Sequence, residues 1–134
     1  MKDIEIIKEK AKKLAEKYGL SLVVLFGSQV SGRTHPMSDY DFGFISEKEK
    51  ELEEKLKIAY EFSQDLKLGE IDFVDLKNVS PLFMKCVADE SVLLYEKGDA
   101  VYDRFKIYAF KLYVEAKRLF EMKEESLKLF LATN

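Results

Sequence analysis

The sequence predicts a single α/β domain in which helices flank a mixed β-sheet. Stretches with helical periodicity alternate along the chain with short apolar runs, which is the pattern of helices packed on a sheet. The connection between the first two apolar runs is too short for a crossover helix, so these two strands are expected to be antiparallel. The 134 residues fit one domain, with a core over about residues 1–96 and a long C-terminal helix over about 98–130.

The first third of the chain is expected to form a helix, two strands and a short connection between them. Apolar residues within Ile4–Tyr18 recur every three or four positions, and Gly19 is expected to end that helix. The nearly continuous apolar run Leu20–Phe26 predicts a strand that is buried on both faces. A short helix or turn over Gly27–Arg33 and a loop would lead to a second strand over Asp39–Ser46.

The next helix is predicted to begin at Ser46. The stretch Ser46-Glu47-Lys48-Glu49 fits the capping-box pattern, and the helix is expected to run to about Leu66. Its buried stripe is expected to contain Leu52, Leu56, Ala59, Tyr60 and Phe62. After a break at Gly69, Glu70–Leu76 is predicted to form the third strand.

Two helices and one short strand are expected in the last third of the chain. Ser80-Pro81 should open a helix that runs to about Asp89, because proline is tolerated at the first helical position. Val92–Tyr95 predicts a short edge strand. The final helix is expected to pack on the domain through Phe105, Tyr108, Ala109, Leu112, Ala116 and Leu119. Further apolar residues widen this stripe and indicate either a protein interface or a thicker core: Phe110, Tyr113, Val114 and Phe120.

The composition narrows the class of protein. The net charge of −3 argues against a general nucleic-acid binder, which needs a basic surface for the phosphates. A single cysteine excludes an internal disulfide. No apolar run approaches the roughly 20 residues of a membrane span, and the N-terminus has no apolar signal region, so a cytoplasmic protein is expected.

A glycine–serine pair and two closely spaced aspartates carry the candidate chemistry. Gly27-Ser28 follows the first strand, where backbone N–H groups at a helix start would favour an anion. Asp39 and Asp41 are two residues apart, so in a strand both carboxylates lie on the same face. Two carboxylates beside a phosphate-binding turn are what hard divalent cations need.

These residues resemble the signature of the DNA polymerase β-like nucleotidyltransferases. The match comprises Gly27-Ser28, the stretch Ser38-Asp39-Tyr40-Asp41-Phe42 and the later Ile71-Asp72-Phe73, and it extends over most of the chain. The short chain resembles the minimal nucleotidyltransferase (MNT) branch, many members of which are antitoxins paired with HEPN-domain toxins. The resemblance implies the nucleotidyltransferase fold and transfer of AMP from ATP to a hydroxyl, that of a tyrosine of a cognate HEPN toxin.

The resemblance also implies the roles of individual residues. Asp39, Asp41 and Asp72 would be the catalytic carboxylates and would bind two Mg²⁺ ions. Gly27, Ser28 and Ser38 would contact the nucleotide, and Arg33 would either hold a phosphate or be solvated. Asp75 competes with Asp72 for the third carboxylate position, because the two are three residues apart and face opposite sides of a strand. Asp72 matches the family pattern, whereas Asp75 could cap the turn to Asn78.

One departure from the family pattern keeps other functions open. Gln29 and Ser31 stand where many MNT relatives carry arginine, so triphosphate binding could be weak. The chain could then be an antitoxin that acts mainly by direct binding. A small-molecule nucleotidyltransferase, similar to the aminoglycoside-modifying relatives, is a further alternative. The apolar final helix could also join copies of the chain in a homo-oligomer.

Overall fold

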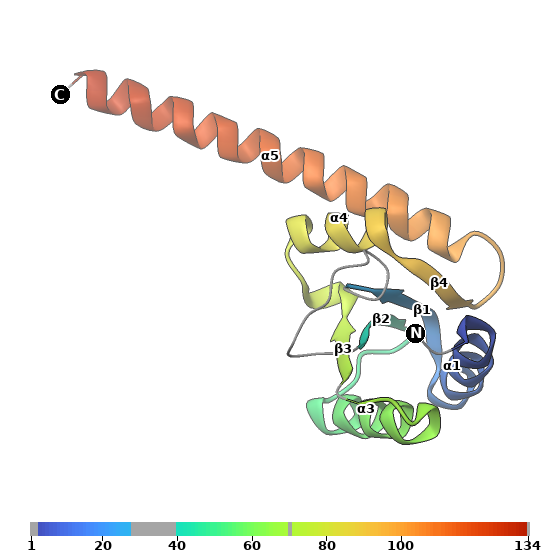
Figure 1. Cartoon of the computed structure of the whole chain (residues 1–134). Helices are drawn as coiled ribbons and strands as arrows, with labels where there is room; N and C mark the ends of the chain where they lie inside the picture. Colours follow the sequence, from blue (N-terminus) through green and yellow to red (C-terminus); the bar gives the residue numbers. More distant parts are fainter. Residues whose placement is uncertain (1–2, 28–39, 70, 134) are drawn as a thin grey trace.

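The structure, a computed structural model, describes residues 3–27, 40–69 and 71–133. In that part of the chain a four-stranded sheet carries α1 and α3 on one face and α4 and α5 on the other (Figure 1). The elements are α1 (Ile4–Tyr18), β1 (Leu20–Phe26), β2 (Tyr40–Ser46), α3 (Leu52–Leu66), β3 (Ile71–Asp75), the 3-10 turn η1 (Leu76–Asn78), α4 (Pro81–Glu90), β4 (Val92–Glu96) and α5 (Val101–Thr133).

The sheet is mixed, as the sequence predicts. Its strand order is β3-β2-β1-β4, with β1 antiparallel to both β2 and β4 and with β2 parallel to β3. Val92–Glu96 is therefore an edge strand, as expected. The predicted short helix over Gly27–Arg33 lies outside the described residues except for Gly27.

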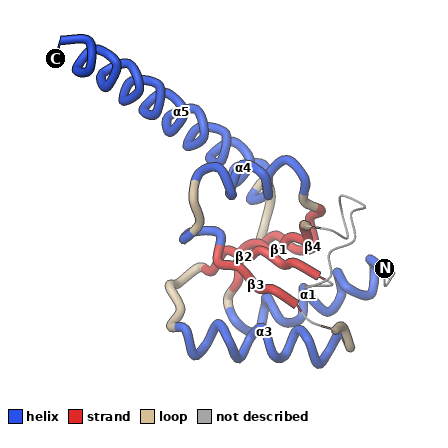
Figure 2. Tube along the Cα trace, turned by 60° about the vertical axis from the view of Figure 1, so that its left-hand side comes forward, coloured by secondary structure: helices blue, strands red, loops and turns tan. Residues whose placement is uncertain are grey.

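Two apolar layers cover the faces of the sheet, and β1 contributes to both. Val23 and Leu25 pack with α1 and α3, whereas Leu22 and Val24 pack with α4 and α5. All four side chains are fully buried, which confirms that β1 is buried on both faces. Figure 2 shows the same order of layers from another direction.

Local signals at two helix ends act as predicted. Gly19 ends α1 in the left-handed conformation, at φ 69°, and its N–H donates to the carbonyl of Ala15. Ser80 caps α4 by accepting a hydrogen bond from the Phe83 N–H at 3.1 Å, with Pro81 as the first helical residue.

The predicted start of α3 is wrong, and so is its predicted buried stripe apart from Phe62. Ser46 is the buried last residue of β2, and its hydroxyl donates to the carbonyl of Lys48 instead of capping a helix. The helix begins at Leu52. Ile58, Phe62 and Leu66 are its buried residues, whereas three members of the predicted stripe, Leu52, Leu56 and Tyr60, are more than 60% exposed.

An aromatic cluster explains the orientation of α3. The ring centroid of Phe62 lies 5.5 Å from that of Phe42 and 4.9 Å from that of Phe73. Both stripes on the helix have a four-residue spacing, so periodicity alone could not tell them apart. The contacts of Phe62 with two strands select the face that meets the sheet.

The last helix packs on the domain through its first half only. Phe105 and Ala109 are its buried residues, and Leu112 packs against them. Tyr108 and Leu119 are more than half exposed, so their predicted place in the buried stripe is wrong. The C-terminal half of α5 extends well beyond the body of the domain (Figure 1).

The surplus apolar residues of α5 therefore do not build a thicker core. Phe110 is 58% exposed and Phe120 is 63% exposed, and further apolar residues on the protruding half are similarly exposed. Tyr113 is half-buried, with Lys85 of α4 5.4 Å above its ring. No helix in the described ranges has the length and apolar character needed to cross a membrane.

Candidate functional site

The end of β1 and the starts of β2 and β3 meet at one edge of the sheet. Asp41 in β2 lies opposite Phe26 in β1 and, on its other side, opposite Asp72 in β3. Residues directly opposite each other project from the same face of a sheet. Phe26 belongs to the apolar layer under α4 and α5, so Asp41 and Asp72 also lie on that face.

The two aspartates are neighbours in register. Adjacent strands are about 4.8 Å apart, which is a distance that one divalent ion can bridge between two carboxylates. The intervening positions support the same alignment, because Phe42 and Phe73 face the opposite layer and pack with Phe62. Asp72 is exposed to solvent. The sheet therefore brings together two of the three predicted carboxylates, one of them accessible to a ligand.

Asp75 has a structural role on the other face of β3. Its carboxylate accepts hydrogen bonds from the Lys77 N–H at 3.0 Å and from the Asn78 side-chain amide at 2.8 Å, and it pairs with Lys55 at 3.0 Å. Burial alone would raise the pKa of Asp75, but the hydrogen bonds and charge of Lys55 and the Lys77 N–H outweigh it, so the pKa is lowered. Asp75 thus caps the turn to Asn78, which was the alternative role considered for it.

Gly27 touches the carboxylate of Asp41. A Cβ atom at position 27 would lie 2.9 Å from the carboxyl carbon of Asp41 and closer still to its Oδ2. Gly27 also has φ +83°, a conformation that L-residues with side chains rarely adopt. The sequence suggested a glycine for close approach of a phosphate, and the structure adds the neighbouring aspartate as a second reason for it.

The other predicted site residues lie outside the described part of the chain. These are Ser28, Arg33, Ser38 and Asp39. Among the described residues, no three histidine, cysteine or acidic side chains come close enough to hold a metal ion together. Asp41 and Asp72 alone supply two carboxylates. Their hard oxygen donors suit Mg²⁺, and the third donor would come from Asp39.

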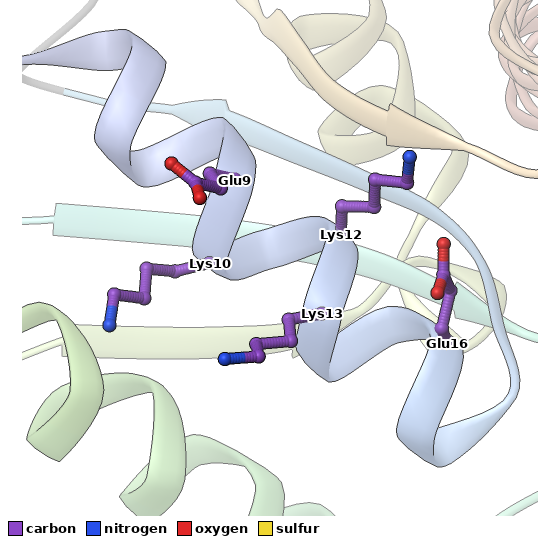
Figure 3. A pocket seen from close by; sticks show the side chains of 5 residues that line it. All are labelled: Glu9, Lys10, Lys12, Lys13 and Glu16. Atoms are coloured by element: carbon purple, nitrogen blue, oxygen red, sulfur yellow. The ribbon is translucent and has the colours of Figure 1, made fainter.

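A surface pocket on α1 is unrelated to these carboxylates. Figure 3 shows that the side chains of a single helix line it. Because α1 covers the opposite face of the sheet, this pocket lies on the other side of the domain from Asp41 and Asp72. Lysines and glutamates spaced along one helix are typical of a solvated surface: Glu9, Lys10, Lys12, Lys13 and Glu16.

The sequence interpretation missed an aromatic contact beside the site. The ring of Phe83, in the first turn of α4, lies 5.8 Å from the ring of Phe26 in an edge-to-face arrangement. A hint was present in the sequence, since Leu82 and Phe83 fall next to the stripe through which α4 packs on the domain. Only the fold shows that Phe83 reaches the strand that ends at Gly27.

Comparison with known proteins supports one family. Residues 9–100 match the family model described as polymerase beta, nucleotidyltransferase. A curated relative, the protein adenylyltransferase MntA of Aphanizomenon flos-aquae (strain 2012/KM1/D3), is 31% identical over 121 residues, which cover 84% of this chain and 81% of the relative.

Two solved structures with the same fold come from toxin–antitoxin complexes. A chain from a toxin–antitoxin crystal structure with AMP-PNP matches with a TM-score of 0.73 at 20% identity, covering 90% of this chain and 98% of that one. A chain from the complex of a tri-AMPylated Shewanella oneidensis HEPN toxin with an MNT antitoxin matches with a TM-score of 0.71 at 17% identity, covering 94% and 99%. At these identities the matches establish a shared fold.

Proposed function

Because the chain belongs to the polymerase β nucleotidyltransferase family, we propose that it transfers AMP from ATP to a hydroxyl of a partner protein. The partner is a HEPN-domain toxin and the acceptor is one of its tyrosines. AMP transfer, together with direct contact, silences the toxin, so the chain acts as an antitoxin. The curated relative carries the name of a protein adenylyltransferase, and the structural neighbours come from toxin–antitoxin complexes that include AMP-PNP or an AMPylated HEPN toxin.

The register of β2 and β3 is the observation that carries this proposal. It aligns Asp41 with Asp72 on one face, and Gly27 lies in contact with the carboxylate of Asp41. Nucleotidyl transfer needs charge neutralisation and alignment more than covalent help from the protein. A carboxylate pair next to a glycine turn provides both at the edge of a rigid sheet.

Asp39, Asp41 and Asp72 would hold two Mg²⁺ ions, which when bound neutralise the triphosphate and lower the pKa of the attacking hydroxyl. In the reaction the tyrosine oxygen bonds to the α-phosphorus of ATP, and the bond from that phosphorus to the leaving pyrophosphate breaks. Asp72, which is exposed at the edge of the sheet, would accept or orient the hydroxyl proton. The Gly27 backbone, Ser28, Arg33 and Ser38 would bind the phosphates.

The protruding half of α5 supports binding to a partner protein. Large apolar side chains that remain exposed on a helix are typical of an interface, and here they continue the stripe that is buried nearer the domain. Phe120, Leu127 and Phe130 are each about 60% exposed. A HEPN toxin covering this surface would be bound away from the carboxylates, so direct binding and AMP transfer can both contribute to silencing.

The test compares two aspartates on the same strand. The chain is co-expressed with its toxin, and the purified proteins are incubated with labelled ATP and Mg²⁺. Asp72→Asn, like Asp39→Asn combined with Asp41→Asn, should reduce label on the toxin by orders of magnitude. Asp75→Asn is the matched control, because its side chain faces the other way and makes structural contacts. It should keep the transfer activity.

The same assay separates the alternatives. Label on the toxin that depends on Asp72 supports the proposal. An antitoxin that neutralises its toxin with no transfer in the wild type would act by binding alone. Transfer of label to an aminoglycoside, but never to protein, would point to a small-molecule enzyme.

A further inference from the structure

Phe26 lies in the same row of side chains as the candidate carboxylates. The register pairs Phe26 with Asp41 and Asp41 with Asp72, so the row crosses β1, β2 and β3 on the face covered by α4 and α5. Neighbouring strands are about 4.8 Å apart, so the side chain of Phe26 begins one strand spacing from Asp41. An aromatic surface therefore lies directly beside the carboxylates.

Phe83 extends this surface from α4. Its ring is perpendicular to that of Phe26, with the centroids 5.8 Å apart, which is a favourable geometry for an aromatic pair. The backbone of Phe83 is fixed in the first turn of α4, because its N–H donates to the Ser80 hydroxyl and Pro81 begins the helix. The backbone that carries the ring is thus fixed before any ligand binds, and the contact with Phe26 orients the ring against β1.

Phe83 is nevertheless not used to fill the core. The helix packs on the sheet through Met84, Val87 and Ala88, which are at most 5% exposed, whereas Phe83 is 40% exposed. Leaving a large aromatic ring partly in water forgoes much of the stabilisation that its burial would bring. An exposed aromatic ring that is held in place next to the carboxylates of Asp41 and Asp72 is suited to stack on a flat ligand.

We infer that Phe83, supported from behind by Phe26, is the surface on which the base of the nucleoside triphosphate stacks. The inference rests on the proposed function, since it takes the triphosphate to lie at Gly27 and the carboxylates. Stacking on an aromatic ring uses the π-face that every base has, and it does not read hydrogen bonds at the base edge. Phe83 therefore contributes affinity for the base, with a larger contribution for purines because of their larger rings.

The test measures binding of two ligands that differ by the nucleoside. Calorimetric titration of the full chain uses Mg²⁺-ATP and Mg²⁺-tripolyphosphate, which has the phosphates but no base. Phe83→Ala should weaken ATP binding by about 5- to 150-fold, which corresponds to the loss of one stacked base. It should leave tripolyphosphate binding unchanged, and this second ligand also shows that the variant is folded.

Three further variants separate the effect of aromatic stacking from the effects of apolar volume and of a change in the first turn of α4. Phe83→Tyr keeps an aromatic face and should bind ATP like the wild type. Phe83→Leu keeps apolar volume without an aromatic face and should behave like Phe83→Ala. Leu82→Ala is the control for the first turn of α4, since Leu82 is 63% exposed and is not in the aromatic pair. It should leave ATP binding unchanged.

Two results would overturn the inference while leaving the proposed function intact. One is an unchanged ATP affinity in Phe83→Ala. The other is a loss of ATP and tripolyphosphate binding by the same factor, which would assign Phe83 to the fold or the phosphate site. If the wild type bound neither ligand, both the inference and the proposed nucleotidyl transfer would fall. Loss of toxin co-purification with normal ATP binding would instead make Phe83 part of the partner surface.

Discussion

Replacing Gly27 by alanine should destabilise the fold through the left-handed backbone conformation at this position and should also displace the carboxylate of Asp41. The added Cβ would lie 2.9 Å from the Asp41 carboxyl carbon, where ordinary contacts begin at 3.4 Å, so the carboxyl group must move by at least 0.5 Å. Functional groups need to be held to within about 0.5 Å, and a 1 Å misplacement can cost about 100-fold in rate. We therefore expect AMP transfer to fall by roughly 10- to 100-fold.

Gly98 provides a matched control for this substitution. It has the same φ of +83°, but nothing lies within 4 Å of a Cβ built there. Gly98→Ala should cost only the left-handed conformation, about 1–2 kcal/mol of unfolding free energy, and should keep full transfer activity. Gly27→Ala should cost more than that, because the carboxylate must also be displaced.

Urea unfolding and the transfer assay on both variants test this reasoning, with Asp41→Ala added to the unfolding experiment. Removing the Asp41 carboxylate should relieve the two closest contacts and leave only the Asp41 Cβ, at 3.1 Å. The double variant Gly27→Ala/Asp41→Ala should therefore be destabilised by less than the sum of the two single variants. The reasoning is refuted if Gly27→Ala is no less stable than Gly98→Ala and transfers AMP at the wild-type rate. Gly27 would then be an ordinary turn glycine.

Three further predictions concern stability and partner binding. The pKa of Asp75 is lowered in the folded protein, so the stability that its carboxylate contributes is present above the unfolded-state pKa and is lost as the pH falls through the folded-state pKa. Asp75→Asn should therefore lower the free energy of unfolding in urea by about 1–2 kcal/mol at pH 7 and by much less at pH 2. Phe120→Glu should abolish co-purification with the toxin while Mg²⁺-ATP binding stays normal in calorimetry, because an unpaired charge would be buried in the interface. Removing residues 119–134 should change the unfolding free energy by less than about 1 kcal/mol, since no residue of α5 after Ala109 is buried, but it should release the toxin. A large loss of stability on thermal unfolding would contradict the proposal that the C-terminal half of α5 serves partner binding and not the core.

The sequence predicted those elements whose signals are local. Gly19 at the end of α1 and Ser80-Pro81 at the start of α4 act through backbone conformation and hydrogen bonds a few residues away. The strand Leu20–Phe26 was correct because a run of that length, without polar residues at alternate positions, can only be covered from both sides. The antiparallel pairing of β1 and β2 followed from the short connection between them.

The errors arose where tertiary contacts decide between equivalent local choices. The capping-box pattern at Ser46 has the right spacing, but the Ser46 hydroxyl is used to donate to the Lys48 carbonyl, and α3 begins only at Leu52. In α5 the periodic apolar stripe continues past the domain, and nothing in its sequence marks where the sheet and α4 end. Leu119 lies on this protruding part of the helix. Tyr108 lies in the packed half but stays more than half exposed, at the rim of a pocket that Leu76 also lines.

For the candidate site, the sequence distinguished Asp72 from Asp75 through the family pattern and through the position of Asp75 next to the turn to Asn78, and the structure adds the contacts of Asp75. Asp75 forms an ion pair with Lys55 and accepts a hydrogen bond from the Lys77 N–H in the turn that follows β3. Asp72 lies in register with Asp41 and is exposed to solvent. The contact between Gly27 and Asp41 could not be predicted, since it depends on the pairing of β1 with β2.

The alignment of the carboxylates is a consequence of the apolar core on the other face of the sheet. Phe42 and Phe73 are opposite each other, and both pack on Phe62, while Phe44 stacks on Phe73 at 4.5 Å. If β3 slipped by one residue, the side chain of Phe73 would point toward the carboxylate site and that of Asp72 would point into the aromatic cluster. That register is unfavourable because it buries an unpaired carboxylate. The aromatic cluster therefore excludes the alternative register, and Asp72 is held beside Asp41 by residues that never touch a ligand.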